Sequence, residues 1–185
     1  MYFNSPGPEN TQETIKIAVR EAKERKVSHI VVASNTGATA FTLAEEVRKQ
    51  GYEGKMVCVT HVYGFAESGV NELSDESRLD LEKQGVRVHT AAHALSGAER
   101  GLSNKFQGVY PVEMIAHSLR MLGQGMKVCV EISVMALDAG LVPFGKPVIA
   151  IGGSGRGADN ASLLTPGYSS SVLSTKVHEI LCKPL

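Results

Sequence analysis

An alternation of short apolar runs with amphipathic helical segments constrains this 185-residue chain more than any other feature. The apolar runs cover residues 28–34, 55–60 and 86–90. Apolar residues at helical spacing fill the segments before and between them, over residues 10–26, 38–50 and 75–84. Continuous apolar runs are typical of strands buried on both faces, and their alternation with helices is typical of a parallel sheet. We therefore predict an α/β fold of the three-layer αβα type, in which one sheet lies between two layers of helices.

Helix boundary signals agree with this interpretation. Asn10 and Glu13 form a capping-box-like start for the first helix. Gly51 is a good C-terminal stop for the second helix, and Ser74 can cap the third.

The second half of the chain is less regular. A short helix is predicted near 97–102, and two longer helices over 111–122 and 126–139. A fourth strand follows at 147–152. Two strand-like runs in the tail, VLS and VHEILC, predict a hairpin or antiparallel edge strands. No repeat or linker interrupts the chain, so residues 1–185 are predicted to form one domain with a mostly parallel sheet.

The charge balance excludes several classes of partner. The chain has 19 basic and 19 acidic residues and a formal net charge of zero. General nucleic-acid binders and polybasic membrane-surface proteins usually show a basic excess, so neither partner is expected, although a local basic patch stays compatible with a neutral total. The most apolar stretch contains Lys127, Glu131 and Asp138, which disfavours a membrane span.

Redox and targeting signals favour a cytoplasmic protein. Three cysteines lie far apart, with no spacing typical of a metal site or a disulfide framework. The N-terminus, MYFNSPGPEN, lacks the basic and apolar regions of a secretory signal. We therefore expect free thiols and no metal.

The turn after the first strand is the first candidate binding site. It comprises Ser34, Asn35, Thr36, Gly37, Ala38 and Thr39. A helix start offers unpaired backbone N–H groups and a dipole that favours anions, and ligands of open α/β sheets sit at the carboxyl ends of strands. Small hydroxyl side chains add donors, and Gly37 would let a phosphate approach the backbone. Ordinary helix capping with nothing bound is the alternative.

The turn after the fourth strand is the second candidate. It contains Gly152, Gly153, Ser154, Gly155 and Arg156. Too few residues follow Asp159 for a dinucleotide-binding βαβ unit, so we predict a flexible loop that closes over a ligand, with Arg156 contacting an anion. A glycine-rich hairpin connection is the alternative. Both turns follow strand ends, which could place them at one cleft.

Residues after the second strand could form another wall of this cleft. They are Thr60, His61, Tyr63, Gly64 and Phe65, and the aromatic rings could stack on a planar ligand or simply pack within the loop. Arg100 and Lys105 are expected at the surface. The other five histidines show no ligand spacing, and a buried Glu131 or Asp138 is expected to cap or pair rather than touch a ligand. No catalytic residue can be assigned.

The segment SHIVVASNTGATAFTLAEEVRK resembles the C-terminal domain of pyruvate kinase. Ser34, Thr36, Gly37, Thr39 and Ala40 fit that family's small-hydroxyl turn. KMVCVTH and KPVIAIGGSGRGADN fit its next strand and its late glycine-rich loop. The resemblance covers 10–65 well and 146–165 loosely, and it implies that the two loops hold phosphate groups. No catalytic barrel is present, so pyruvate kinase activity is not expected.

The chain looks most like stand-alone bacterial and archaeal proteins built from this domain alone. That resemblance implies flavin mononucleotide as the cofactor, with its phosphate on Ser34–Thr39 and its ring near His61–Phe65 and the 152–159 loop. Flavin redox chemistry is then the expected class if the protein is an enzyme. A non-catalytic sensor of a sugar phosphate is the alternative. A structural subunit that assembles through its sheet edge is a third hypothesis, and a homo-oligomer is compatible with all three.

Overall fold

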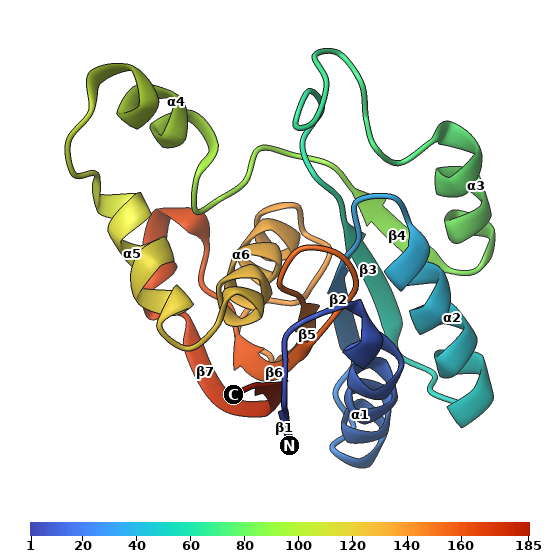
Figure 1. Cartoon of the computed structure of the whole chain (residues 1–185). Coiled ribbons are helices and arrows are strands. Elements are labelled where there is room, and N and C mark those ends of the chain that lie inside the picture. Colours follow the sequence, from blue (N-terminus) through green and yellow to red (C-terminus); the bar gives the residue numbers. More distant parts are fainter.

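A computed structural model describes all residues, 1–185, and shows a seven-stranded mixed sheet between two layers of helices (Figure 1). Across the sheet, the strands are β1 (Tyr2–Phe3), β7 (Lys176–Pro184), β6 (Asn160–Thr165), β5 (Val148–Gly152), β2 (His29–Ala33), β3 (Lys55–Val59) and β4 (Val86–His89). Strands β4, β3, β2 and β5 are parallel neighbours. Strand β6 is antiparallel to both β5 and β7, and β1 pairs parallel with β7. The predicted α/β class, with a mostly parallel sheet and antiparallel strands toward one edge, is confirmed.

Helices cover both faces of the sheet. The α-helices are α1 (Thr11–Glu24), α2 (Ala38–Gln50), α3 (Asp75–Lys83), α4 (Gly97–Phe106), α5 (Pro111–Arg120) and α6 (Gln124–Asp138). Helices α1, α2 and α3 share one apolar cluster with the sheet, whereas α5 and α6 share the other. Two short 3-10 helices, η1 (Pro8–Asn10) and η2 (Ser169–Ser174), complete the list.

The alternation of side chains along each central strand explains the continuous apolar runs. In β2, Ile30 and Val32 belong to the cluster under α1 and α2, whereas Val31 belongs to the cluster under α6. In β5, Ile149 and Ala150 face opposite clusters in the same way. Successive strand residues point to opposite faces, so a strand covered on both faces must be apolar throughout.

Two of the three helix boundary predictions are confirmed. Ser74 Oγ accepts a hydrogen bond from the Ser77 amide at 3.1 Å at the start of α3. Gly51 follows α2 with a left-handed φ of 63°. The capping box at Asn10 is wrong, because η1 runs directly into α1 and the Asn10 side chain donates instead to Ser5 O, at 2.8 Å.

The tail departs most from the prediction. The run VLS lies in η2, not in a strand. Strand β6 is formed by the segment NASLLT. It was not predicted, because the buried polar residues Asn160 and Ser162 interrupt its apolar sequence. These two residues bond to each other, Ser162 Oγ to Asn160 Oδ1 at 3.0 Å, which satisfies them inside the sheet. The predicted VHEILC strand is confirmed as β7, antiparallel to β6.

Candidate functional site

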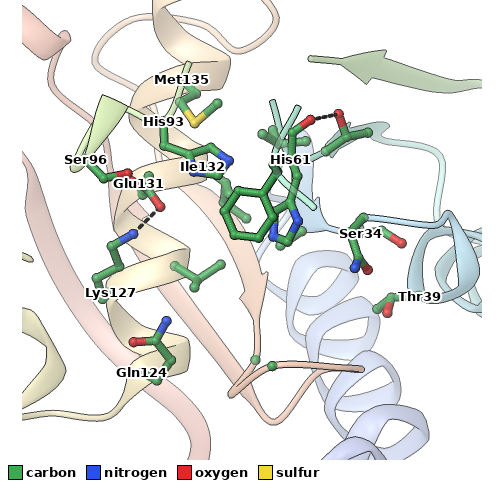
Figure 2. A pocket seen from close by; sticks show the side chains of 18 of the residues that line it. Ser34, Thr39, His61, His93, Ser96, Gln124, Lys127, Glu131, Ile132 and Met135 are labelled. Carbon is green, nitrogen blue, oxygen red and sulfur yellow. Dashed lines mark hydrogen bonds and ion pairs between the residues drawn. The ribbon is translucent and has the colours of Figure 1, made fainter. Parts of the chain in front are cut away.

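The strand order reverses beside β2, since β3 and β4 lie on one side of it and β5 on the other. In open α/β sheets such a point is the usual ligand crevice. A cavity of about 430 Å³ lies here, within the range of about 300–1,000 Å³ typical of small-molecule sites. Figure 2 shows Ser34 and Thr39 on one side of it and Lys127 and Glu131 of α6 on the other. Its lining therefore joins residues from both halves of the chain.

The start of α2 presents unused hydrogen-bond donors at the cavity. Ser34 and Thr39 are 5% and 6% exposed and both line the cavity. Ser34 Oγ accepts from the Ala40 amide at 3.4 Å, and no protein acceptor meets the amides of residues 36–39. Together with the helix dipole, these groups can bind an anion.

The backbone and the packing both require a glycine at position 37. Its φ is +94°, a region that side-chain-bearing residues rarely adopt. A Cβ at this position would lie 3.0 Å from Leu73 Cδ1 and 3.3 Å from Phe41 Cε2, and it would point into the packed side chains behind the turn. Ser34, Asn35 and Thr39 of this turn line the cavity, whereas Gly37 does not, and its contact with a phosphate stays a prediction.

A hydrogen-bonded network connects this turn with the end of β3. Glu72 Oε1 accepts from Asn35 Nδ2 at 2.8 Å, and Glu72 Oε2 lies 2.5 Å from His61 Nδ1. Burial favours the neutral carboxyl of Glu72, but the hydrogen bonds from His61 and Asn35 and the nearby Arg156 outweigh it, so the pKa of Glu72 is lowered. Glu72 is therefore an ionised partner of His61.

An aromatic cluster surrounds His61. The Phe65 ring centroid lies 3.8 Å from that of His61, and the His93 ring lies 5.5 Å from both. Burial lowers the pKa of His93, although the nearby Glu131 acts in the opposite direction. These three rings line the cavity together, although Phe65 is 55% exposed, whereas Tyr63 does not line it.

The opposite wall carries a buried ion pair that the sequence analysis did not assign to the site. Lys127 and Glu131, one turn apart on α6, are 6% and 5% exposed, and Lys127 Nζ donates to Glu131 Oε2. The other carboxylate oxygen accepts from the Leu95 amide at 2.9 Å. Glu131 is therefore paired with Lys127 and satisfied by the Leu95 amide, as expected, and it also lines the cavity. Asp138 only caps, accepting from the Ser169 amide at 3.1 Å.

Two arginines near this wall differ in their pairing. Arg100 lines the cavity rather than only the outer surface, and its Nε donates to Glu113 Oε1 at 2.6 Å. Arg120 has no carboxylate partner. Its Nε donates to Gln124 Oε1 at 2.8 Å, and its Nη1 is buried without any partner. A buried, unpaired guanidinium N–H is costly unless something binds it.

The glycine-rich segment after β5 is a tight hairpin connection whose base is anchored. The Ala158 amide donates to Thr11 Oγ1 at 2.9 Å, and the buried Asp159 accepts from the Gly7 amide at 3.1 Å. Gly153, Gly155 and Gly157 line the cavity, whereas the Arg156 side chain at the tip is exposed. The segment therefore connects the antiparallel strands β5 and β6 with its glycines at the cavity rim, and its closure over a ligand stays a prediction.

The structure brings together half of the residues predicted for the site. Those that line the cavity are Ser34, Asn35, Thr39, Thr60, His61, Phe65, Gly153 and Gly155. Those that do not are Thr36, Gly37, Ala38, Tyr63, Gly64, Gly152, Ser154 and Arg156. The lining residues that were missed come mainly from the middle of the chain: His93, Ser96, Arg100, Arg120, Gln124, Lys127, Val128, Glu131, Ile132 and Met135. Charges on the otherwise apolar α6 were the one available signal.

Two further tests of the structure concern membranes and metals. None of the helices combines the length and the apolarity that crossing a bilayer requires. Nowhere do three or more His, Cys, Asp or Glu side chains gather as a metal site would need.

Comparison with known proteins agrees with the resemblance seen in the sequence. The family model "Pyruvate kinase, alpha/beta domain" matches residues 12–164, which includes the irregular middle. A pyruvate kinase structure from Cryptosporidium parvum is 14% identical, with 83% of this chain and 21% of that chain covered and a TM-score of 0.42. A structure of Cryptosporidium parvum pyruvate kinase in complex with ADP is 16% identical, with 86% and 24% covered and a TM-score of 0.42. The chain thus spans 21% and 24% of the length of these kinases, and it belongs to the pyruvate kinase alpha/beta domain family.

Proposed function

We propose that the cavity binds a small molecule with a phosphate group, and that this molecule is flavin mononucleotide. The observation that carries the proposal is the set of unused donors at the start of α2, next to a cavity with an aromatic wall. A cytoplasmic location belongs to the same proposal, since the three cysteines are buried free thiols.

The phosphate would be held by the chain at the turn between β2 and α2. The Thr39 amide and the hydroxyls of Ser34 and Thr39 supply donors at the cavity without a charged side chain, and the free amides of residues 36–38 belong to the same turn. The exposed Arg156 at the tip of the hairpin could pair with the phosphate if the tip moves inward, as the sequence analysis expected.

The ring system fits the wall made by His61, Phe65 and His93. Polar groups on α6, among them Gln124 and Lys127, face the same space and can meet the polar edge of a flavin or its sugar-alcohol chain. When bound, the flavin would supply redox chemistry, which the protein side chains lack.

A sugar phosphate is the second candidate ligand, and the protein would then be a non-catalytic sensor. The observation in its favour is the polarity of the lining, where only 6 of 21 residues are hydrophobic and Arg100, Arg120 and Lys127 are cationic. Hydroxyl-rich ligands suit such a surface better than an extended planar ring does.

Ligand titration separates the candidates. Flavin mononucleotide should bind, and the protein should quench the fluorescence of the bound flavin. At about 100-fold excess over Kd, the flavin should raise the free energy of unfolding of the protein by ~2.7 kcal/mol. Riboflavin lacks the phosphate and should bind at least ~10-fold more weakly, because a hydrogen bond to a charged group contributes about 1.5–3 kcal/mol. Equal binding of the two would refute the phosphate site. A thermal shift with fructose 1,6-bisphosphate and none with the flavin would favour the sensor.

A matched pair of variants tests the location of the phosphate. Thr39→Val removes a hydroxyl at the cavity while it keeps the side-chain shape, so it should weaken flavin mononucleotide binding by ~10-fold. Thr42→Val is the control, because the Thr42 hydroxyl donates within the helix to Ala38 O at 3.1 Å and is not in the cavity. Equal affinities of the two variants would place the phosphate elsewhere.

A further inference from the structure

We propose that His61 is an acid–base residue that takes a proton from a hydroxyl group in the cavity, and that Glu72 is its positioning residue. The inference builds on the proposed function, because a ligand held at Ser34–Thr39 would extend past His61. It adds a reaction class, proton transfer at a hydroxyl of the ligand or of water, to a site so far described only as a binding site.

The first support is the geometry of the His61–Glu72 pair. His61 Nδ1 lies 2.5 Å from Glu72 Oε2, and the second oxygen of Glu72 is held by Asn35 Nδ2 at 2.8 Å. Both oxygens of the carboxylate are therefore held, and Oε2 accepts a hydrogen bond from the Nδ1–H group of His61. A carboxylate that orients an imidazole in this way sets its tautomer and stabilises the imidazolium that forms on proton uptake.

The second support is the free ring nitrogen. His61 Nε2 has no hydrogen-bond partner in the structure, and His61 lines the cavity. With the proton on Nδ1, Nε2 carries a lone pair that is available to a molecule in the cavity. Phe65 packs at 3.8 Å and His93 at 5.5 Å between ring centroids, and these contacts restrict the orientation of the imidazole.

A carboxylate partner distinguishes His61 from the other ionisable groups of the cavity. Glu72 is ionised, because its hydrogen bonds and the nearby Arg156 outweigh burial and lower its pKa. Burial lowers the pKa of His93, and the Lys127–Glu131 pair on the opposite wall is internally neutralised. Of the two histidines that line the cavity, His61 is therefore the one with a hydrogen-bonded carboxylate, that of Glu72.

In the proposed step one bond breaks and one bond forms. The O–H bond of the hydroxyl breaks, its electron pair stays on the oxygen, and the proton forms a bond with His61 Nε2. The resulting imidazolium is balanced by the Glu72 carboxylate, and the reverse transfer returns the proton to the product. No oxidant or reductant takes part in this step.

Nuclear magnetic resonance can test the geometry without a ligand. In ¹⁵N-labelled protein, neutral His61 should carry its proton on Nδ1, whereas free histidine prefers Nε2. Glu72→Ala should lose this preference, because no carboxylate then accepts from Nδ1. Glu67→Ala, an exposed carboxylate of the same loop, is the control and should keep the preference. A proton on Nε2 in the parent protein, or an unchanged His61 in Glu72→Ala, would overturn the proposal.

Hydrolysis of ethyl dichloroacetate, with water as the hydroxyl donor, tests the chemistry, because an ester with an activated acyl group and a poor leaving group favours proton removal from water over direct attack by the imidazole. The parent protein should accelerate hydrolysis above the buffer rate, and His61→Asn should lose at least ~10-fold of that acceleration. Glu72→Ala should lose most of the acceleration too, and Glu72→Gln, whose amide oxygen can still accept from Nδ1, should recover part of it. His117→Asn, an exposed histidine on α5, should keep the parent rate. Equal rates for the parent and His61→Asn would refute the role of His61.

The phosphate site is tested separately in the same assay. Inorganic phosphate should inhibit hydrolysis if it binds at Ser34–Thr39, beside His61. Hydrolysis that depends on His61 but ignores phosphate would support the acid–base role and count against the phosphate site.

Discussion

Gly157→Ala gives the most direct test of how the glycine-rich hairpin is seated. Gly157 has a φ of +73°, and a Cβ there would overlap Thr11 Oγ1 and lie 2.7 Å from Pro8 Cα. Pro8 Cα is backbone and cannot rotate away. Thr11 Oγ1 also accepts from the Ala158 amide at 2.9 Å, so movement of Thr11 would break that hydrogen bond. The substitution should therefore separate the hairpin from the N-terminal segment.

The magnitude has two parts. A left-handed backbone costs an alanine ~1–2 kcal/mol, and overpacking adds ~1–3 kcal/mol. Gly140→Ala isolates the first part, because Gly140 has a similar φ of +68° and no neighbour within 4 Å of the added Cβ. Urea unfolding should show Gly157→Ala to be less stable than Gly140→Ala by ~1–3 kcal/mol. In a thermal melt the gap should be about 2–4 °C for each kcal/mol.

Equal losses of stability in the two alanine variants would refute the packing argument. They would mean that the hairpin does not rest on Pro8 and Thr11, and that its anchored base is not a fixed rim of the cavity. If the gap is found, the same variants can be titrated with flavin mononucleotide. Gly157→Ala should then weaken binding more than Gly140→Ala, because only Gly157 lines the cavity.

Three further predictions concern stability. Lys127→Met should cost ~3–5 kcal/mol in urea unfolding, because it leaves Glu131 buried and unpaired, and adding Glu131→Gln should recover part of the loss. Ser74→Ala should cost ~1 kcal/mol by removing the cap of α3, whereas Ser68→Ala in the exposed loop should cost nothing measurable in the same assay. Burial lowers the pKa of His29, so the unfolded chain binds this proton first and stability should fall as the pH drops below ~6.5, less steeply in His29→Gln.

The central sheet was predictable because its strands have only one kind of environment. Residues of β2, β3 and β5 are covered on both faces, so nearly every position is apolar and the runs stand out in the sequence. Strand β6 is equally buried but contains Asn160 and Ser162, which satisfy each other by a hydrogen bond. Strand β1 has two residues and exists only through its pairing with β7, so no local pattern could reveal it.

The residues of the candidate site were predictable only where they directly follow a strand. Ser34, Thr60 and Gly153 follow β2, β3 and β5, and parallel strands bring their carboxyl ends to one edge. Lys127 and Glu131 lie inside a helix, where a charged pair at this spacing usually marks a solvated face. Burial of this helix was expected from its apolar sequence, but the position of the pair at the cavity depends on how α6 covers the sheet, which helical periodicity does not specify.

The pairing of charges around the cavity bears on which ligand it suits. Lys127 is matched by Glu131, Arg100 by Glu113 and His61 by Glu72. This leaves Arg120 in the wall and Arg156 beside Glu72 without a carboxylate within ion-pair distance. One phosphate monoester carries about −1.5 to −2 charges at neutral pH, which a helix start, Arg120 and, once the hairpin tip moves inward, Arg156 can balance. A bisphosphate would bring twice that charge into a protein with no net positive field, so the pairing favours flavin mononucleotide over a sugar bisphosphate.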